Sequence, residues 1–123
     1  MALRVAVVGA TGNVGQEMLN ILDERLFPAD EVFAVASRRS IGRSVSFGER
    51  ELKCHDIEQF DFSTIDLCFM ATDSAMALEW ARHGIRVNSL CPGYIETPLW
   101  QKYIDEDQSV RETISHRQPI GRL

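Results

Sequence analysis

The chain has 123 residues, of which 45% are hydrophobic and 25% are charged. That length and composition predict one soluble globular domain over residues 1–123. The net charge of −5, with no run of Lys or Arg, argues against a nucleic-acid partner. No apolar stretch has the length of a membrane span and no signal peptide is recognised, so we expect no membrane partner.

The cysteines and histidines indicate neither a disulfide framework nor a metal site. The three cysteines are odd in number and far apart, without C-x-x-C spacing, and the three histidines are isolated. We therefore expect a protein of a reducing cytoplasm, no metal ligands, and histidines at the surface or in loops. The residues concerned are Cys54, Cys68, Cys91, His55, His83 and His116.

The most informative stretch is residues 4–20, RVAVVGATGNVGQEMLN. A short apolar run ends at Gly9, two glycines follow, and residues 16–22 have the pattern of an amphipathic helix. Gly9 lets the chain leave the strand at backbone angles that a side chain would forbid. Gly12 leaves room for a pyrophosphate, and Gly15 lets the helix pack closely on the strand. The N–H groups and positive dipole end of that helix would then face the phosphates.

The glycine spacing is G-x-x-G-x-x-G, one residue longer before the second glycine than the common dinucleotide fingerprint. The alternative is a tight turn that binds nothing. The strand before the motif and the helix after it favour the dinucleotide.

Residues 31–36, EVFAVA, form an almost fully apolar segment typical of a buried parallel strand. Ser37, Arg38, Arg39 and Ser40 follow, where a dinucleotide fold binds the adenosine ribose. No Asp or Glu is present there to bind the ribose 2′-hydroxyl of NAD. Arginines and serines can instead bind the 2′-phosphate of NADP through charge-assisted hydrogen bonds. This composition predicts NADP rather than NAD, the alternative being a solvated polar loop.

The remaining elements alternate between strands and helices. We expect a hairpin over residues 44–55, an irregular segment over 56–65, strands over 66–71 and 85–91, and helices over 75–83 and part of 99–115. Cys68 is interpreted as a core residue of its strand. This order predicts an α/β fold, a Rossmann-like doubly wound parallel sheet in three αβα layers.

Two family resemblances are carried by successive parts of the chain. VAVVGATGNVGQEML, LDERLFPADEV, ASRRSIG, VSFGERELK and FDFSTIDLCFMA resemble the amino-terminal cofactor domain of aspartate-semialdehyde dehydrogenase, over about residues 1–72. ALEWARHGIRVNSLCPGYIETPL, with the segment that follows it, is similar to the late part of short-chain dehydrogenase/reductases. The chain is therefore interpreted as a single truncated domain, a recombinant or designed chimera whose second part is 73–123, with a natural fusion as the alternative.

The catalytic residues of both resembled families are missing, so we expect none here. The first family needs a cysteine nucleophile in a later segment, and Cys54, Cys68 and Cys91 do not match that motif. The second family needs a tyrosine followed four residues later by lysine. Tyr94 is followed at that distance by Pro98, and Tyr103 by Asp107.

Three hypotheses follow: an NADP-binding domain without turnover, a residual oxidoreductase, and a folded scaffold that binds no cofactor. The truncated second part also predicts a homodimer or higher oligomer, because strand 85–91 would lie at a sheet edge. The resemblance to the second family adds its Pro-Gly turn and Thr97 to the site. The predicted dinucleotide-binding residues are Gly9, Thr11, Gly12, Asn13, Val14, Gly15, Ser37, Arg38, Arg39, Ser40, Ala71, Pro92, Gly93 and Thr97.

Overall fold

The computed structural model describes residues 2–72, 80–81, 85–90, 92, 95 and 97–117. Contacts divide the chain into two compact units, Met1–Gly84 and Ile85–Leu123, which are treated separately below. The single domain over residues 1–123 stays a prediction.

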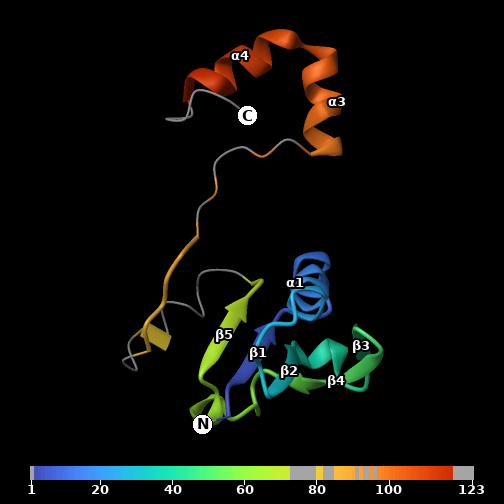
Figure 1. Cartoon of the computed structure of the whole chain (residues 1–123), viewed down its shortest axis with the longest axis vertical. Helices are drawn as coiled ribbons and strands as arrows, with labels where there is room; N and C mark the ends of the chain where they lie inside the picture. The colour runs from blue at the N-terminus through green and yellow to red at the C-terminus, as the bar shows by residue number, and fades with distance from the viewer. Residues whose placement is uncertain are drawn as a thin grey trace. The chain divides into compact units, whose positions relative to one another are not determined.

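The first unit is built on a five-stranded sheet with the order β3-β4-β2-β1-β5 (Figure 1). β1 pairs in parallel with both β2 and β5, and β2 pairs in parallel with β4. β3 is antiparallel to β4 and closes the predicted hairpin. The strands are β1 Arg4–Val8, β2 Glu31–Ala36, β3 Ser44–Phe47, β4 Arg50–Asp56 and β5 Leu67–Met70. The predicted Rossmann-like α/β class with a mainly parallel sheet is confirmed.

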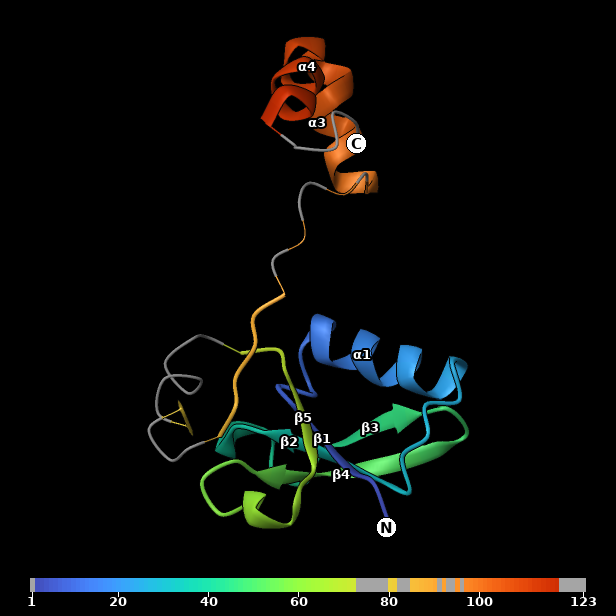
Figure 2. The same ribbon diagram turned by 60° about the vertical axis from the view of Figure 1, so that its left-hand side comes forward.

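Helix α1, Asn13–Glu24, covers one face of this sheet (Figure 2). Its buried residues Leu19 and Leu22 pack with Val5 and Val7 of β1 and with Ala34 of β2. The helix begins three residues before the predicted 16–22, because Gly12 already takes the N-cap position. The main core of the unit therefore lies between α1 and the sheet.

The opposite face is covered by an aromatic cluster. Phe33 of β2 lies 5.6 Å from Phe60, Phe60 lies 4.9 Å from Phe62, and Phe62 lies 4.6 Å from Trp80, measured between ring centroids. These rings pack against the buried side chains of Ala6, Val8 and Val35. Trp80 and Ala81 are helical, and the rest of the predicted helix 75–83 lies outside the described residues.

The predicted strand over residues 85–91 is wrong for the part that the structure describes. Residues 85–90 have no regular secondary structure, and all six side chains are exposed, Leu90 to 92%. The alternation of IRVNSL suits a strand, but a strand also needs a neighbour to take up its N–H and C=O groups. No described strand pairs with these residues.

The second unit contains two helices where one partly helical segment over 99–115 was predicted. They are α3, Pro98–Glu106, and α4, Gln108–Arg117 (Figure 1). Asp107 separates them, and its carboxylate accepts hydrogen bonds from the Ser109 N–H at 2.9 Å and the Ser109 hydroxyl at 2.7 Å. This is the pattern of an N-cap, which explains why a new helix starts there. Ile104 is buried in this unit.

Candidate functional site

The carboxyl ends of three neighbouring parallel strands bring the predicted residues of the first unit to one edge of the sheet. Gly9 follows β1, Ser37 follows β2 and Ala71 follows β5. The Ala71 N–H donates to the Val8 carbonyl at 2.9 Å, and the Gly9 N–H donates to the Val35 carbonyl at 2.9 Å. Ligands of open α/β sheets bind outside this edge, at the point where strand order reverses.

Residues 9–15, here called the glycine loop, owe their shape to close backbone packing. Gly9 has a φ of +82°, which favours glycine, and a Cβ added there would lie 2.6 Å from the Ala71 carbonyl oxygen. A Cβ on Gly15 would lie 2.2 Å from the Gly9 carbonyl oxygen. A real Cβ atom does not lie this close to a carbonyl oxygen, so the backbone packing leaves room only for glycine at both positions, as the sequence predicts.

Gly12 differs from the other two glycines of the loop. Its φ is −83°, and the nearest atom to an added Cβ is the Gly9 carbonyl oxygen at an ordinary 3.4 Å. Gly12 is exposed and forms the N-cap of α1, and among the described residues no side chain caps this helix. No acidic residue lies in the first turn of α1. Nothing in the described fold therefore demands a glycine here, and Asn13 and Val14, the first two residues of α1, are exposed.

Residues 37–42, here called the arginine turn, follow β2 and contain the short 3₁₀ helix η1, Arg38–Ser40. Arg38 and Arg39 are exposed, and within the described part of the chain neither forms an ion pair. Parallel pairing also places Asp56, the last residue of β4, opposite Ala36. Asp56 is far from β2 in the sequence, so the residues that directly follow β2 do not predict a carboxylate at this position. The Asp56 carboxylate accepts a hydrogen bond from the Glu58 N–H at 3.2 Å.

One side-chain hydrogen bond joins the glycine loop to the arginine turn. The hydroxyls of Thr11 and Ser40 lie 3.2 Å apart, and either can donate. Ser40 is only 7% exposed. Among the residues that the structure describes, it is the one polar residue that is buried. The sequence singles out both residues as binding residues, but no signal in it predicts that two hydroxyls 29 positions apart meet.

The three site residues predicted in the carboxy-terminal part belong to the second unit or lie outside the described residues. Pro92 is exposed and has no regular structure, and Gly93 is not among the described residues. Thr97 precedes α3, and its hydroxyl accepts a hydrogen bond from the Trp100 N–H at 3.3 Å. Thr97 therefore has a structural role as the N-cap of this helix.

The two described thiols are poor nucleophiles at neutral pH. Burial raises the pKa of Cys68 to about 11, and burial also raises the pKa of Cys54, against a smaller lowering by Arg43. A thiol reacts as its thiolate, so both are largely unreactive near pH 7. Cys91 lies outside the described residues. Among the residues that the structure covers, His, Cys, Asp and Glu form no group suited to a metal ion, and no helix could cross a membrane.

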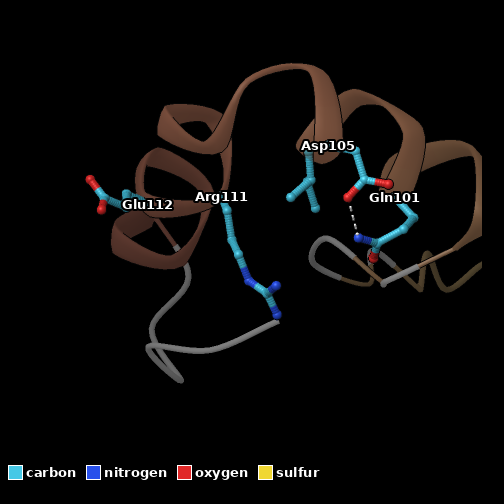
Figure 3. Close-up of a pocket in the computed structure, with 5 residues that line it drawn as sticks. Gln101, Asp105, Arg111 and Glu112 are labelled. Atoms are coloured by element: carbon cyan, nitrogen blue, oxygen red, sulfur yellow. Dashed lines mark hydrogen bonds between the residues drawn. The ribbon is translucent and has the colours of Figure 1, made fainter.

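The second unit contains a pocket of about 210 Å³ that holds none of the predicted site residues. It is lined by Gln101, Ile104, Asp105, Arg111 and Glu112. Figure 3 shows the Gln101 amide donating to the Asp105 carboxylate, at 2.9 Å. This bond joins residues one helical turn apart on α3, so it supports the helix.

A parallel α/β sheet with a glycine loop and a basic turn at the ends of adjacent strands defines a dinucleotide-binding domain of the Rossmann-like class. The family described as semialdehyde dehydrogenase, NAD binding domain, matches residues 4–89, and the chain belongs to this family. The family indicates a nicotinamide dinucleotide as the ligand class. A second family, described as enoyl-(acyl carrier protein) reductase, matches residues 70–123.

Relatives and solved structures agree on the first part of the chain. Aspartate-semialdehyde dehydrogenase of Rickettsia bellii is 51% identical over 73 residues, which are 59% of this chain and 22% of that protein. The Legionella pneumophila enzyme is 44% identical over 79 residues, 64% of this chain and 23% of its own length. A probable aspartate-semialdehyde dehydrogenase from Pseudomonas aeruginosa matches in structure with a TM-score of 0.63 and 40% identity, over 68% of this chain and 25% of that one. The chain thus spans about a quarter of the proteins it matches.

Proposed function

We propose that this chain is an NADP(H)-binding domain of the aspartate-semialdehyde dehydrogenase type, joined to a short-chain-dehydrogenase segment and without catalytic turnover. The observation that carries the choice of NADP is the arginine turn. Its two guanidinium groups are exposed at the end of β2, beside the glycine loop, with no ion pair to a described carboxylate. Two such groups can hold a 2′-phosphate by charge-assisted hydrogen bonds.

Gly12 supports the pyrophosphate half of the proposal. The described fold has space for a Cβ at Gly12. At Gly9 and Gly15, backbone atoms leave no space for one. A pyrophosphate placed on the first turn of α1 needs the space that the missing side chain leaves, and the uncapped N–H groups there attract anions. The proposed direct ligands are the exposed groups of this turn and of Ser37, Arg38 and Arg39.

The chimeric origin is supported by the two family matches, which overlap only over residues 70–89. That overlap covers the passage from β5 toward the predicted helix 75–83, a passage that both resembled families possess. The absence of turnover is supported by the raised pKa values of Cys54 and Cys68. A residual oxidoreductase is less favoured because neither described thiol is activated and neither tyrosine of the chain is followed four residues later by lysine.

Self-association and a cytoplasmic setting complete the proposal. β5 is the terminal strand of the described sheet, and edge strands with free N–H and C=O groups pair readily with a second copy. Cys54 and Cys68 are both unpaired thiols, which suits a reducing compartment. Light scattering of the concentrated protein would report the oligomeric state.

Titration with NADPH and NADH, followed by cofactor fluorescence, tests the proposed ligand. We expect tighter binding of NADPH and a loss of about ten-fold or more when Arg38 and Arg39 are both changed to alanine, since charge-assisted hydrogen bonds contribute about 1.5–3 kcal/mol. Asp56→Asn is the matched control at the same edge and should leave NADPH binding intact or tighten it. Unchanged NADPH binding in the double variant, or NADH binding that depends on Asp56, would overturn the NADP assignment.

A further inference from the structure

The two edges of the described sheet differ in how they are protected (Figure 1). β3, at one edge, alternates buried apolar residues with the exposed serines Ser44 and Ser46, and Arg43 precedes it. β5, at the other edge, has the sequence LCFM, with no charge and no proline. Charges and prolines keep an edge strand from pairing with a further strand through its unpaired N–H and C=O groups. β5 is therefore the edge that is open to strand addition.

β5 is also less covered than β1, the strand beside it. Residues Val5–Val8 of β1 have a neighbouring strand on both sides and are fully buried, whereas Leu67 of β5 is 37% exposed and the other three residues are only half-buried. Phe69 packs against the core on the α1 side, and Cys68 packs against the core on the aromatic side. A further strand beside β5 would extend both layers of the core.

Residues 85–90, here called the donor segment, have the composition of such a strand. The sequence IRVNSL has β-branched residues at alternate positions and is about as long as an ordinary strand. Ile85 and Val87 are exposed to 45% and 40%. Contacts group the segment with the second unit, and no described strand pairs with it. Extended segments of this kind bind an open sheet edge by adding a strand.

We propose that the donor segment of a second copy of this chain pairs with β5 and becomes a sixth strand of the sheet. Each copy has one open β5 edge and one donor segment, so a reciprocal exchange uses both and closes into a two-fold symmetric dimer. This inference rests on the proposed self-association and names the two surfaces that carry it.

Hydrogen exchange of the full chain, measured by mass spectrometry over a range of concentrations, locates the contact. Exchange of the β5 amides and of the donor-segment amides should slow together as the dimer forms, because both gain partners in the same ladder. Exchange of β3 should not change with concentration, which makes the opposite edge the internal control. Protection of β5 and the donor segment that is already complete in the monomer would show pairing within one chain and overturn the proposal.

Two variants test the donor and the acceptor separately, with the dimer followed by analytical ultracentrifugation. Val87→Pro removes an N–H from a segment without regular structure and should weaken dimerisation at least about ten-fold. Val87→Thr keeps that N–H and the branched shape and should dimerise as the parent does. Leu67→Lys places a charge on the open edge and should weaken dimerisation to a similar extent.

A mixture of the two weakened variants gives the sharpest result. Val87→Pro retains an intact β5, and Leu67→Lys retains an intact donor segment, so one pairing between them remains possible. The mixture should form a heterodimer at concentrations where each variant alone is monomeric. A dimer that Val87→Pro leaves unchanged would retain the proposed self-association but overturn its assignment to β5 and the donor segment. A parent chain that stays monomeric when concentrated would overturn both.

Discussion

The glycine loop and the arginine turn lie at the ends of adjacent parallel strands, yet they are built by different means. Backbone atoms hold the glycine loop, where an added Cβ on Gly15 would lie 2.2 Å from the Gly9 carbonyl oxygen. The arginine turn contains a short 3₁₀ helix in which Arg38 and Arg39 are exposed and Ser40 is buried. One segment therefore depends on packing, and the other depends on its side-chain chemistry. The same edge of a sheet therefore combines a segment shaped by backbone packing with one that exposes charged side chains.

Gly15→Ala tests the packed segment and should have the largest effect. The new Cβ would collide with the Gly9 carbonyl oxygen and with Ala10 Cα, 2.8 Å away, both of which are backbone atoms. We expect a loss of about 3 kcal/mol in the free energy of unfolding, at the high end for overpacking, measured by urea denaturation with circular dichroism. A variant as stable as the parent would show that the loop is not held by this contact.

Gly12→Ala separates the packing of the glycine loop from its binding. The described fold leaves space for this Cβ, so the free energy of unfolding should fall by only about 1 kcal/mol, the cost of alanine at an N-cap. NADPH binding should weaken by at least about ten-fold, because the methyl group occupies the space of the pyrophosphate. Retained NADPH affinity would mean that the ligand does not approach this turn.

Gly42→Ala probes the arginine turn by backbone strain alone. Gly42 has a φ of +82°, and an added Cβ would meet nothing within 4 Å. The substitution should cost about 1 kcal/mol in stability, the penalty for a side chain in the left-handed region. Gly42→Asn should cost less, since asparagine tolerates that region. Equal losses for the two variants would point to a contact made elsewhere.

The dependence of dinucleotide binding on ionic strength should distinguish the proposed 2′-phosphate site at the arginine turn from the proposed pyrophosphate site at the glycine loop. We expect this effect to be the smallest of the four. Exposed charges are screened by salt, whereas N–H groups at a helix start carry only partial charges. Raising salt from about 50 to about 300 mM should weaken NADPH binding about three-fold more than NADH binding. The added salt dependence should disappear when Arg38 and Arg39 are changed to alanine. An equal response of both dinucleotides in the parent would place the 2′-phosphate away from the exposed arginines.

Local pattern predicted most of the first unit because its signals do not depend on distant partners. Residues 31–36 are apolar except for Glu31, and β2 has those bounds. The hairpin predicted over residues 44–55 is formed by β3 and β4, with Gly48 and Glu49 between them. The same reasoning failed at residues 85–90, where the alternation is that of a strand but no described neighbour pairs with it.

The amino-acid sequence by itself determined the strand, glycine loop and helix at the start of the chain and the basic character of the turn after β2. Those features follow from local backbone freedom, periodicity and charge. Only the tertiary structure decided that Thr11 meets Ser40, that Asp56 ends opposite Ala36, and that Gly12, unlike Gly15, has space beside it. These relations depend on which strands become neighbours and in what register, and pairing between segments far apart in the chain leaves no local signal.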